Sequence, residues 1–507
     1  MTGATTPPSP EEIHREKLAR AREDPEGRLL SNVDWIASLP PEERGRYSLR
    51  RKPTRTLSGV AVVAVMTAPA ACPHGRCTYC PGGLESGSPQ SYTGEEPSAL
   101  RGAQFHYDSR AIAAHRLEAL EAIGHPTSKV EVIVMGGTFP SRPRDYQRRV
   151  FHGIYDGLNG ELSPTLEAAQ ARNETAERRL VGLTIETRPD WCDERVIPFL
   201  LDAGVTRVEI GVECLEEEVL QSVGRAHDGA AVVRATENAR RAGWKIAYHM
   251  MLGLPGMTPE RDREGFRRLF ADPAFRPDML KIYPTLVLPG TALYEEWRAG
   301  RYSPYDTETA AELLARIKEE IPPWVRIQRI QRDIPARLIA DGVRAGNLRQ
   351  IALAKLARRG GRCRCLRCRE VGRIGRPDPE AFSLTTRRYA AGEGEEVFLA
   401  WEDPGTDAVA AFLRLRLPGA NEPDGLPMIR ELKALGAAVP IGTKPGGPDL
   451  YQHRGFGRAL VDRATEIARE QGFARLRVIS AVGTRSYYAR AGFSRDGPWM
   501  AKPLGPS

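Results

Sequence analysis

Six apolar runs of β-strand type alternate with helix-type segments between residues 56 and 325. The runs are SGVAVVAVM (58–66), VEVIVM (130–135), VGLTIE (181–186), TRVEIG (206–211), KIAYHMM (245–251) and MLKIYP (from Met279). Near-continuous apolar strands with helices between them predict a parallel sheet that helices cover on its faces. Six such units form a partial (β/α)6 barrel, in which functional residues gather at the carboxyl ends of the strands.

A different pattern follows residue 384. Strand-type runs in meander-like order (EVFLAWED, AVAAFLRLRL and PMIRELKALG) precede an amphipathic helix, ALVDRATEIAREQG, and one more strand, ARLRVIS. This order predicts a separate α+β domain. We therefore expect an α/β protein of four parts, which are an N-terminal basic extension (1–55), a barrel domain (56–325), a basic linker (326–384) and an α+β domain (385–507).

The composition and the cysteine pattern indicate a cytoplasmic protein. A content of 41% hydrophobic and 27% charged residues is typical of a folded globular chain. No apolar run approaches the roughly 18 residues of a membrane span, and the first residues lack the apolar centre of a secretory signal. Two tight clusters of three cysteines and two isolated cysteines do not form the pattern of a secreted disulfide scaffold. Metal-bound thiolates in a reducing compartment explain the clusters better.

The first cysteine cluster, in ACPHGRCTYCPGG, directly follows the first strand. Cys72, Cys77 and Cys80 can hold three irons of a 4Fe-4S cluster and leave the fourth iron open. S-adenosylmethionine requires such an open iron to chelate through its amino and carboxylate groups. A closed zinc site with His74 as fourth ligand is the alternative. The spacing alone does not decide, because four residues separate the first two cysteines where radical-SAM proteins usually have three.

Residues at the ends of the later strands favour the 4Fe-4S cluster over the zinc site. The segment Gly136-Gly137-Thr138 closes the second strand and resembles the radical-SAM segment that binds the methionyl amine. Glu186 and Glu213 end the third and fourth strands, and a GLPG turn ends the fifth. Each feature is weak alone, since an acid at a strand end is about as often a salt bridge or a helix cap. Together they predict a binding site for S-adenosylmethionine at one end of the barrel.

A glycine-rich turn precedes the amphipathic helix of the last domain. The turn QHRGFG contains Gln452, Gly455 and Gly457 and resembles the Q-x-x-G-x-G turn of GNAT acyltransferases. Its glycines would let backbone N–H groups and the helix N-terminus hold the pyrophosphate of coenzyme A. The later segment RSYYARAGF resembles the tyrosine-bearing helix of that family. Core packing is the alternative for Tyr487 and Tyr488, and we expect it of one of them.

The second cysteine cluster lies in the most basic part of the chain. Cys363, Cys365 and Cys368 fall within six residues, which favours zinc over a disulfide in a cytoplasmic protein. A distant residue such as His453, or Glu370, would have to be the fourth ligand. A trio of surface cysteines without a metal is the alternative.

Two basic stretches give the chain its net charge of +8. Residues 44–55 hold six basic residues and no acid, and residues 326–376 hold fifteen basic residues with a net charge of +12. The two stretches together carry +18, so the remainder carries about −10. This asymmetry is typical of a protein that binds a polyanion such as a nucleic acid. A solvated arginine-rich surface is the alternative.

The motifs together resemble one family along residues 50 to 503. CPHGRCTYCPGG, QSYTGEEPSALRGAQFHYD, KVEVIVMGGTFP, IETRPDWC, QRIQRDIPARLIADGVRAGNLRQ and QHRGFGRAL are similar to the catalytic subunit of Elongator in its stand-alone prokaryotic form. By this resemblance the barrel is a radical-SAM domain, the last domain is a GNAT domain that binds acetyl-CoA, and Lys129 and Tyr488 are catalytic. The further contacts that it implies for acetyl-CoA are Glu431, Leu432, Lys433, Ala434, Phe456, Gly457 and Arg458. The chain departs from the family at Lys433-Ala434, where His-Val is usual.

The resemblance implies a tRNA-modifying enzyme that forms 5-carboxymethyluridine at the wobble position. A radical derived from S-adenosylmethionine would take hydrogen from the acetyl methyl group, the resulting carbon would bond to the uridine, and thioester hydrolysis would leave the carboxymethyl group. An electron donor is implied as a partner, and the basic stretches would hold the anticodon stem-loop of the tRNA while a splayed base enters the barrel. Two alternatives stay open, namely a lysine acetyltransferase with a structural cluster and a tRNA-binding scaffold.

Overall fold

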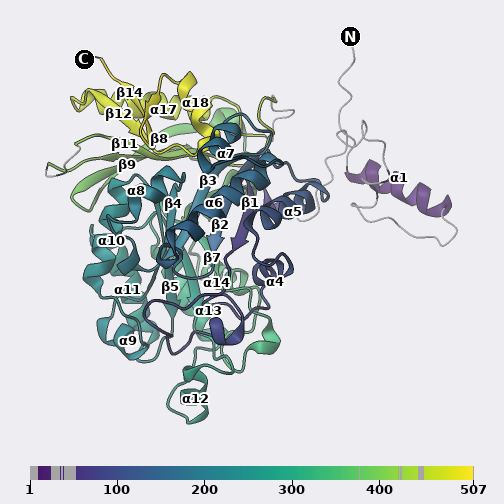
Figure 1. The fold of residues 1–507 in the computed structure, drawn as a ribbon, viewed down its shortest axis with the longest axis vertical. Helices are drawn as coiled ribbons and strands as arrows, with labels where there is room; N and C mark the ends of the chain where they lie inside the picture. The colour runs from purple at the N-terminus through teal and green to yellow at the C-terminus, as the bar shows by residue number, and fades with distance from the viewer. Residues whose placement is uncertain are drawn as a thin grey trace.

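The computed structural model describes residues 10–23, 35, 38, 53–375, 377–420, 422, 425–443 and 450–505. Within these residues the strands form two seven-stranded sheets, which stack end to end in Figure 1. The basic stretch predicted at 44–55 lies almost wholly outside the described residues. Helix α1 (Pro10–Glu23) is the described helix of the N-terminal part.

The first sheet is parallel throughout, with its strands in chain order. Its strands are β1 (Ala61–Met66), β2 (Lys129–Met135), β3 (Arg179–Thr187), β4 (Arg207–Glu213), β5 (Lys245–Leu252), β6 (Met279–Pro284) and β7 (Arg326–Ile330). Apolar side chains from the outer face, such as Val132, Ile185 and Ile246, are fully or almost fully buried. The predicted parallel sheet with covering helices is thus confirmed, as an open half-barrel.

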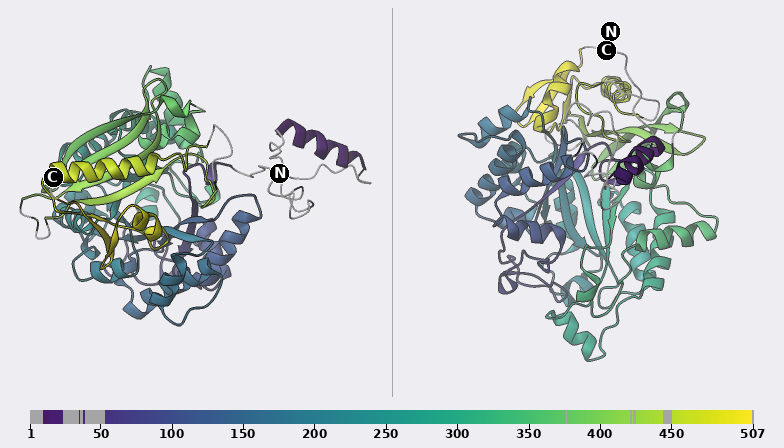
Figure 2. Two further views of the ribbon diagram at one scale, coloured as in Figure 1. Left: turned by 90° about the horizontal axis from the view of Figure 1, so that it is seen from above. Right: turned by 90° about the vertical axis from the view of Figure 1, so that its right-hand side faces the viewer.

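Most helices of this domain cover this outer face, whereas the one at Ala292–Arg298 lies beyond the sheet, at the bottom of Figure 1 (Figures 1 and 2). The helices of the domain are α4 (Pro97–Gln104), α5 (Ser109–Glu121), α6 (Arg144–Asn159), α7 (Leu166–Asn173), α8 (Ile197–Asp202), α9 (Glu217–Ser222), α10 (Gly229–Arg241), α11 (Pro259–Ala271), α12 (Ala292–Arg298), α13 (Thr307–Glu320) and α14 (Leu348–Arg358). Several begin with a side-chain cap, as where Asp108 accepts from the N–H groups of Arg110 and Ala111. Each cap satisfies amide groups that have no partner in the first helical turn.

The second sheet is mixed and has the order β13-β14-β12-β11-β10-β9-β8. Its elements are β8 (Ser383–Ala391), β9 (Gly394–Asp403), β10 (Ala408–Leu417), β11 (Met428–Ala434), β12 (Arg475–Val478), β13 (Ser494–Asp496), β14 (Trp499–Pro503), and the helices α15 (Leu366–Arg369), α16 (Val371–Ile374), α17 (Phe456–Glu470) and α18 (Arg485–Arg490). Helix α17 lies across the sheet in Figure 2 and buries Leu460, Val461 and Ala464 against it. The predicted α+β domain is confirmed as this sheet and its helices.

The parallel sheet has seven strands, where six were expected. The seventh, β7, lies in the segment that we expected to be a linker, because its sequence RIQRI lacks an apolar run. Arg326 is buried there and forms a charge-assisted pair with the carboxylate of Glu370 at 2.5 Å. A buried arginine with a buried counter-ion can take the place of an aliphatic residue in the sheet.

The two sheets share one buried contact region. Asp278 precedes β6 and accepts hydrogen bonds from Arg430 of β11 at 2.7 and 2.9 Å, and Arg414 of β10 lies 3.5 Å from it. Met428 and Ile479 of the second domain belong to the same hydrophobic cluster as the barrel. The second sheet covers the amino ends of strands β1 to β5, so the carboxyl ends face the opposite end of the molecule.

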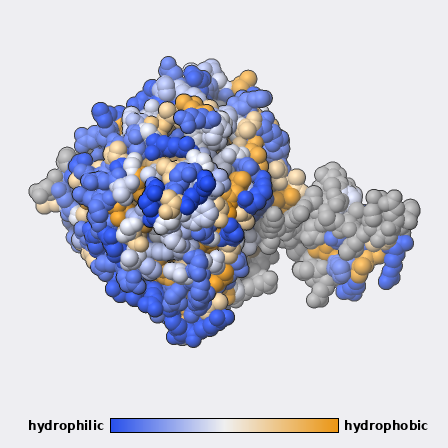
Figure 3. Space-filling view, turned by 90° about the horizontal axis from the view of Figure 1, so that it is seen from below, coloured by the Kyte–Doolittle hydropathy of each residue, from blue (hydrophilic) through white to orange (hydrophobic). Residues whose placement is uncertain are grey.

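That opposite end is predominantly hydrophilic, with scattered hydrophobic side chains (Figure 3). Among the described residues, no helix combines the length and the apolar composition that a membrane span requires.

Candidate active site

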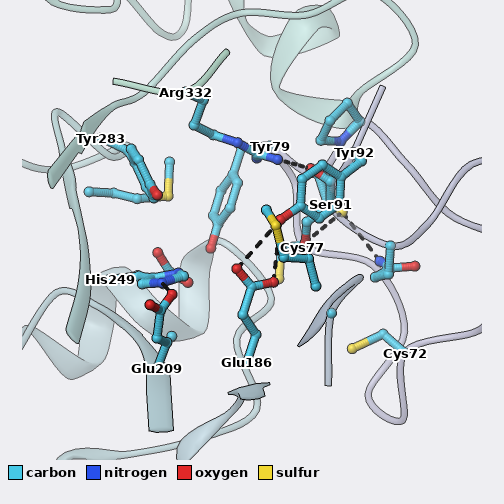
Figure 4. A pocket seen from close by; sticks show the side chains of 18 of the residues that line it. Cys72, Cys77, Tyr79, Ser91, Tyr92, Glu186, Glu209, His249, Tyr283 and Arg332 are labelled. Atoms are coloured by element: carbon cyan, nitrogen blue, oxygen red, sulfur yellow. Dashed lines mark hydrogen bonds and ion pairs between the residues drawn. The ribbon is translucent and has the colours of Figure 1, made fainter. Parts of the chain in front are cut away.

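The first cysteine cluster lies in the loop after β1, at the carboxyl ends of the parallel strands. Cys72, Cys77 and Cys80 line one cavity, named here the cysteine cavity (Figure 4). The loop is held by backbone hydrogen bonds from Gly75 to Cys72 and from Cys80 to Cys77, both 3.0 Å long. Burial raises the pKa of the Cys72 and Cys77 thiols. All three cysteines nevertheless line the same open space.

Polar donors are directed at these sulfur atoms. The amide of Gln90 donates to Cys80 Sγ at 3.2 Å, and the guanidinium of Arg225 lies 3.9 Å from Cys77 Sγ. The coulombic effect of Arg225 opposes that of burial and lowers the pKa of Cys77. The Thr138 hydroxyl lies 3.7 Å from Cys72 Sγ. Such donors stabilise thiolates, which are the form that binds metals.

The spacing of the thiols fits a cluster better than a single zinc ion. Tetrahedral zinc, with Zn–S bonds of about 2.3 Å, requires sulfur atoms about 3.8 Å apart. Across the described ranges, the three-ligand groups with all atoms within 4.8 Å of one another do not include Cys72, Cys77, Cys80 or His74. His74 instead bonds both Cys72 and Cys77 through its two ring nitrogens, at 3.0 and 3.3 Å. An all-thiol set around a wide cavity fits an iron–sulfur cluster, which distributes its ligands over several irons.

The glycine segment after β2 forms one wall of the cysteine cavity. Gly136 and Gly137 have φ angles of 125° and 99°, which favour glycine. A Cβ atom on Gly136 would lie 2.2 Å from the Thr67 hydroxyl. The Gly136 N–H donates to Glu186 at 3.4 Å, and Gly137 and Thr138 line the cavity. Glycine is therefore required for the backbone to come this close.

Buried charges form the floor of the cysteine cavity. Glu186 accepts from the Tyr92 hydroxyl at 3.3 Å, and the Lys281 ammonium group lies 3.8 Å from it. Glu209 contacts Lys281 and lies 3.0 Å from Nε2 of His249 (Figure 4). Burial would raise the pKa of Glu209, but Lys281 and His249 hold it well below its usual range. Because Lys281 contacts both Glu186 and Glu209, and Glu209 also contacts His249, this floor is a network of buried polar and charged side chains.

Glu213 lies at the end of β4 with an unusual backbone. Its φ angle is 69°, and its carboxylate pairs with Arg225 at 3.5 Å. Arg225 also donates to the Gly211 carbonyl at 2.5 Å. Glu213 therefore lines the cavity and also positions the arginine that approaches Cys77.

A second cavity lies at the other end of the sheet, between the amino ends of the parallel strands and the second domain. We name it the lysine cavity, after Lys129, Lys245 and Lys433 in its wall. All of the residues that the sequence assigns to acetyl-CoA line it, namely Lys129, Glu431, Leu432, Lys433, Ala434, Gln452, Gly455, Phe456, Gly457, Arg458 and Tyr488. The structure therefore brings together residues from three distant parts of the chain.

Gln452 connects the walls of the lysine cavity. Its amide NH2 donates to the carbonyls of Ala434 at 2.9 Å and Gly59 at 3.2 Å. Its oxygen accepts from the Lys129 ammonium at 2.5 Å and from the Val439 N–H at 3.0 Å. One side chain thus joins both domains, which explains why a motif glutamine stands at this position.

The turn after Gln452 begins helix α17. Gly455 is the N-cap with a φ of 87°, and no side chain caps the helix. The amide groups of the first turn are therefore available to an anion. A Cβ on Gly457 would lie 2.9 Å from the Tyr487 hydroxyl, so glycine keeps this wall open. Tyr488 is buried in the core of the second sheet and also lines the cavity, which combines the two roles considered for the tyrosine pair.

The lysines of this cavity differ in their partners. Burial lowers the pKa of Lys129 and of Lys245 to about 8. Lys433 pairs with Glu131 at 2.7 Å, and Glu431 accepts from Arg414 at 2.9 Å. Both carboxylates of the cavity are therefore engaged by cations.

The second cysteine cluster is compact. Cys363, Cys365 and Cys368 all lie within 4.8 Å of one another, which is compatible with one tetrahedral ion. The Lys318 ammonium, fully buried, donates to Cys368 Sγ at 3.7 Å. Neither fourth ligand considered from the sequence is near, because Glu370 is bound by Arg326 and His453 lies in the lysine cavity.

The basic stretch 326–376 is largely neutralised within the fold. Ten of its fifteen basic side chains form ion pairs with acidic residues. Arg369 is almost fully buried against Glu402 and Asp407. Arg344 and Arg358 are exposed and belong to no ion pair within the described residues. Most of this positive charge is thus structural.

Sequence reasoning missed several residues of the cysteine cavity. Glu209, His249 and Lys281 occupy inward positions of β4, β5 and β6, which alternation with Glu213 and Met251 could have revealed. Arg225 comes from a loop and had no recognisable signal. The two remaining cysteines, Cys192 and Cys214, are buried among apolar residues.

The sequence and the fold have well-characterised counterparts. The family models described as Radical SAM superfamily and Radical_SAM C-terminal domain match residues 68–269 and 277–358. The tRNA uridine(34) acetyltransferase of Methanocaldococcus jannaschii is 45% identical over 469 residues, covering 90% of this chain and 86% of that protein. Elongator complex protein 3 of Homo sapiens is 43% identical over 491 residues, covering 93% and 89%.

A solved structure is also similar to this chain. The archaeal Methanocaldococcus infernus Elp3 with an N-terminal deletion (1-46) matches with a TM-score of 0.78 and 40% identity. The match covers 89% of this chain and all of that one. With relatives of this identity and coverage, the chain belongs to the Elongator complex protein 3 family of radical SAM proteins.

Proposed function

We propose that this protein attaches a carboxymethyl group to carbon 5 of the wobble uridine (uridine 34) of tRNA, and that it uses S-adenosylmethionine and acetyl-CoA. The observation that carries the proposal is the pair of cavities at opposite ends of one parallel sheet. One is lined by the cysteines of a radical-SAM loop and the other by the residues assigned to acetyl-CoA. Relatives named tRNA uridine(34) acetyltransferase support the choice of substrate. A cytoplasmic location suits both tRNA and reduced thiols.

In this proposal Cys72, Cys77 and Cys80 hold a 4Fe-4S cluster. When reduced by an external electron donor, such a cluster with bound S-adenosylmethionine supplies a radical that can take hydrogen from a methyl group. The protein's own contribution is to bind and orient. Gly136 and Gly137 would allow a close backbone approach, and Glu186 at the end of β3 would bind the methionyl amine.

The lysine cavity binds acetyl-CoA in the same proposal. The first turn of helix α17, with Gly455, Gly457 and Arg458, binds the pyrophosphate through free amide groups and a positive charge. Lys129 and Tyr488, which line the cavity, are the proposed catalytic residues. The acetyl methyl carbon, after loss of one hydrogen, would bond to carbon 5 of the uridine, which would lose its own hydrogen as a proton and pass one electron to an external acceptor. Hydrolysis of the thioester would then release coenzyme A and leave the carboxymethyl group.

One anaerobic experiment tests the function. The protein with reconstituted cluster is mixed with reductant, S-adenosylmethionine, methyl-deuterated acetyl-CoA and total tRNA, and the products are analysed by mass spectrometry. We expect deuterium in 5′-deoxyadenosine together with 5-carboxymethyluridine in tRNA. Acetyl-lysine without either product would contradict the proposal and favour a lysine acetyltransferase.

Binding of tRNA is expected to depend on salt and on the few unpaired arginines. Replacing Arg344 and Arg358 by alanine should weaken tRNA binding about tenfold, because each removes a charge that releases counterions from the phosphate backbone. The wild-type affinity should fall at least about tenfold between roughly 50 and 200 mM salt. A filter-binding titration measures both. Arg301→Ala, which removes an exposed arginine paired with Glu296, is the control, and a flat salt response would contradict a phosphate-binding surface.

The second cysteine cluster is a structural zinc site in this proposal. Leu366, between the cysteines, donates its N–H to Val325 at 2.9 Å, so the metal would fix the segment against β7. We expect Cys365→Ser to lose about one zinc per chain and to lower Tm by a few degrees. Elemental analysis and calorimetry measure the two effects. Cys192→Ser is the control, and an unchanged zinc content in Cys365→Ser would exclude the site.

A further inference from the structure

Only a thin layer of side chains separates the two cavities. On strand β5, Lys245 lines the lysine cavity and His249 lines the cysteine cavity. These residues are four positions apart, which is about 13 Å along a strand. On β2, Glu131 likewise lines the lysine cavity and Met135, four positions later, lines the cysteine cavity. The inside of the half-barrel is therefore the shortest connection between the two sites.

Three inward-facing residues form this layer. Side chains two positions apart on a strand share a face, so Ile133 on β2 and Ala247 on β5 point inward between the cavities. Arg207 on β4 pairs in register with Lys245, and Glu209 pairs with Ala247. Neither cavity is lined by Ile133, Arg207 or Ala247. We name these three residues the partition.

Arg207 reaches from one cavity wall to the other. Its guanidinium donates to Glu131, in the lysine cavity, at 3.5 Å. On the other side its Nε lies 3.8 Å from Oε1 of Glu209, in the cysteine cavity. Glu131 and Glu209 are in turn paired with Lys433 and Lys281. A chain of alternating charges thus runs through the partition from one site to the other.

The hydrogen bonds of Arg207 are incomplete. Its Nε and the Oε1 of Glu209 are both buried, and each lacks a hydrogen-bond partner. A buried donor on a charged group that stays unsatisfied is costly and unusual in folded proteins. A carbonyl oxygen that enters the partition would accept a hydrogen bond from this N–H.

The geometry of the partition matches the thioester end of the acyl donor. On the proposed function, the pyrophosphate lies at helix α17, so the acyl end of the molecule lies against Lys245 and Glu131. We infer that the acetyl group crosses the partition through the inside of the half-barrel, where Arg207 donates to the thioester carbonyl and the methyl group points into the cysteine cavity. This inference rests on the proposed function and adds the path by which its two co-substrates meet. Arg207 is a positioning residue, and Ala247 leaves the space for the acetyl group.

A larger side chain in the partition tests whether the acetyl group crosses it. In Ala247→Leu, deuterium transfer from methyl-deuterated acetyl-CoA to 5′-deoxyadenosine should fall at least tenfold, while formation of 5′-deoxyadenosine itself continues with hydrogen from other sources. Ala315→Leu, at a fully buried position of helix α13, is the matched control for the strain of a larger side chain. Undiminished deuterium transfer in a folded Ala247→Leu protein would overturn the inference.

A binding measurement without S-adenosylmethionine or reductant is independent of the reaction. By calorimetry, wild-type protein should bind acetyl-CoA about tenfold more tightly than coenzyme A, because only the thioester has the carbonyl that Arg207 meets. Arg207→Met should abolish this preference, and Arg207→Lys should restore part of it. Equal preference in wild type and Arg207→Met would overturn the path even if the enzyme modifies tRNA. Failure of wild type to modify tRNA, with the preference intact, would instead overturn the proposed function.

Discussion

Replacing Cys77 by alanine is expected to lower formation of both 5′-deoxyadenosine and 5-carboxymethyluridine at least about 100-fold. The Cys77 thiol is one of three that face the cysteine cavity, and an incomplete ligand set cannot hold a cluster with one open iron. Acetyl-CoA binding should stay within about twofold, because the lysine cavity lies at the other end of the strands. Iron content, product analysis and calorimetry measure the three quantities.

The control for this variant is Cys192→Ala, which removes a buried thiol that packs in the core of the barrel. It should retain iron and both products. Acetyl transfer to protein lysines that survives in Cys77→Ala, with no tRNA product in the wild type, would show that the cluster is only structural. A third result, tRNA binding without 5′-deoxyadenosine in the wild type, would leave the scaffold interpretation.

Removal of the Asp278 carboxylate is expected to destabilise the fold more than any surface change. In Asp278→Ala, Arg430 and Arg414 lose a shared buried counter-ion, which typically costs about 3–5 kcal/mol. The midpoint of urea unfolding measures the loss. Glu296→Ala breaks an exposed pair with Arg301 and should cost less than about 1 kcal/mol. Similar midpoints for the two variants would show that the buried network adds nothing to the stability.

The same carboxyl predicts the direction of the acid response. Burial would raise the pKa of Asp278, but Arg430 and Arg414 hold it at about 2, below the value of 3.8 that it has when unfolded. A depressed pKa means that the folded state binds fewer protons, so this contribution is complete above about pH 4 and is lost as the pH falls toward 2. The difference between the unfolding midpoints of wild type and Asp278→Ala should therefore shrink below about pH 4 and become smallest near pH 2.

The sequence allowed prediction of the elements that carry a continuous apolar pattern. Strands β1 to β6 and helix α17 have such patterns, and the cysteine loop and the glycine turn carry their own spacing. Strand β7 was missed because Arg326 replaces an aliphatic residue and is neutralised by Glu370, 44 positions later. Strand β8 was missed because most of its residues are exposed or half-buried and Ser, Thr and Arg make up more than half of it, so at this sheet edge it has no continuous apolar pattern. Pairing between residues far apart in the sequence, such as Arg326 and Glu370, leaves no local sequence pattern.

Some residues of the two cavities could likewise be predicted from the sequence and others could not. Gly136, Glu186 and Gln452 belong to short motifs, so they could be found one at a time. Arg225 and Arg207 act through partners brought in by other strands or loops, and their role depends on register between strands. The charge of residues 326–376 suggested a free basic surface, yet acids from outside the stretch neutralise much of it, such as Glu312 of helix α13 and Asp407 in the loop before β10. Net charge along the chain does not reveal such neutralisation.

The ion pairs of Asp278 also limit how this protein can be divided or recombined. Either sheet produced alone would expose one half of a pair that is fully buried in the whole chain, an aspartate on one side and two arginines on the other. A chimera that joins this barrel to a different second sheet would need matching arginines at the positions of Arg414 on β10 and Arg430 on β11. The two halves are thus constrained to be inherited together, and variation in one is limited by the charges of the other.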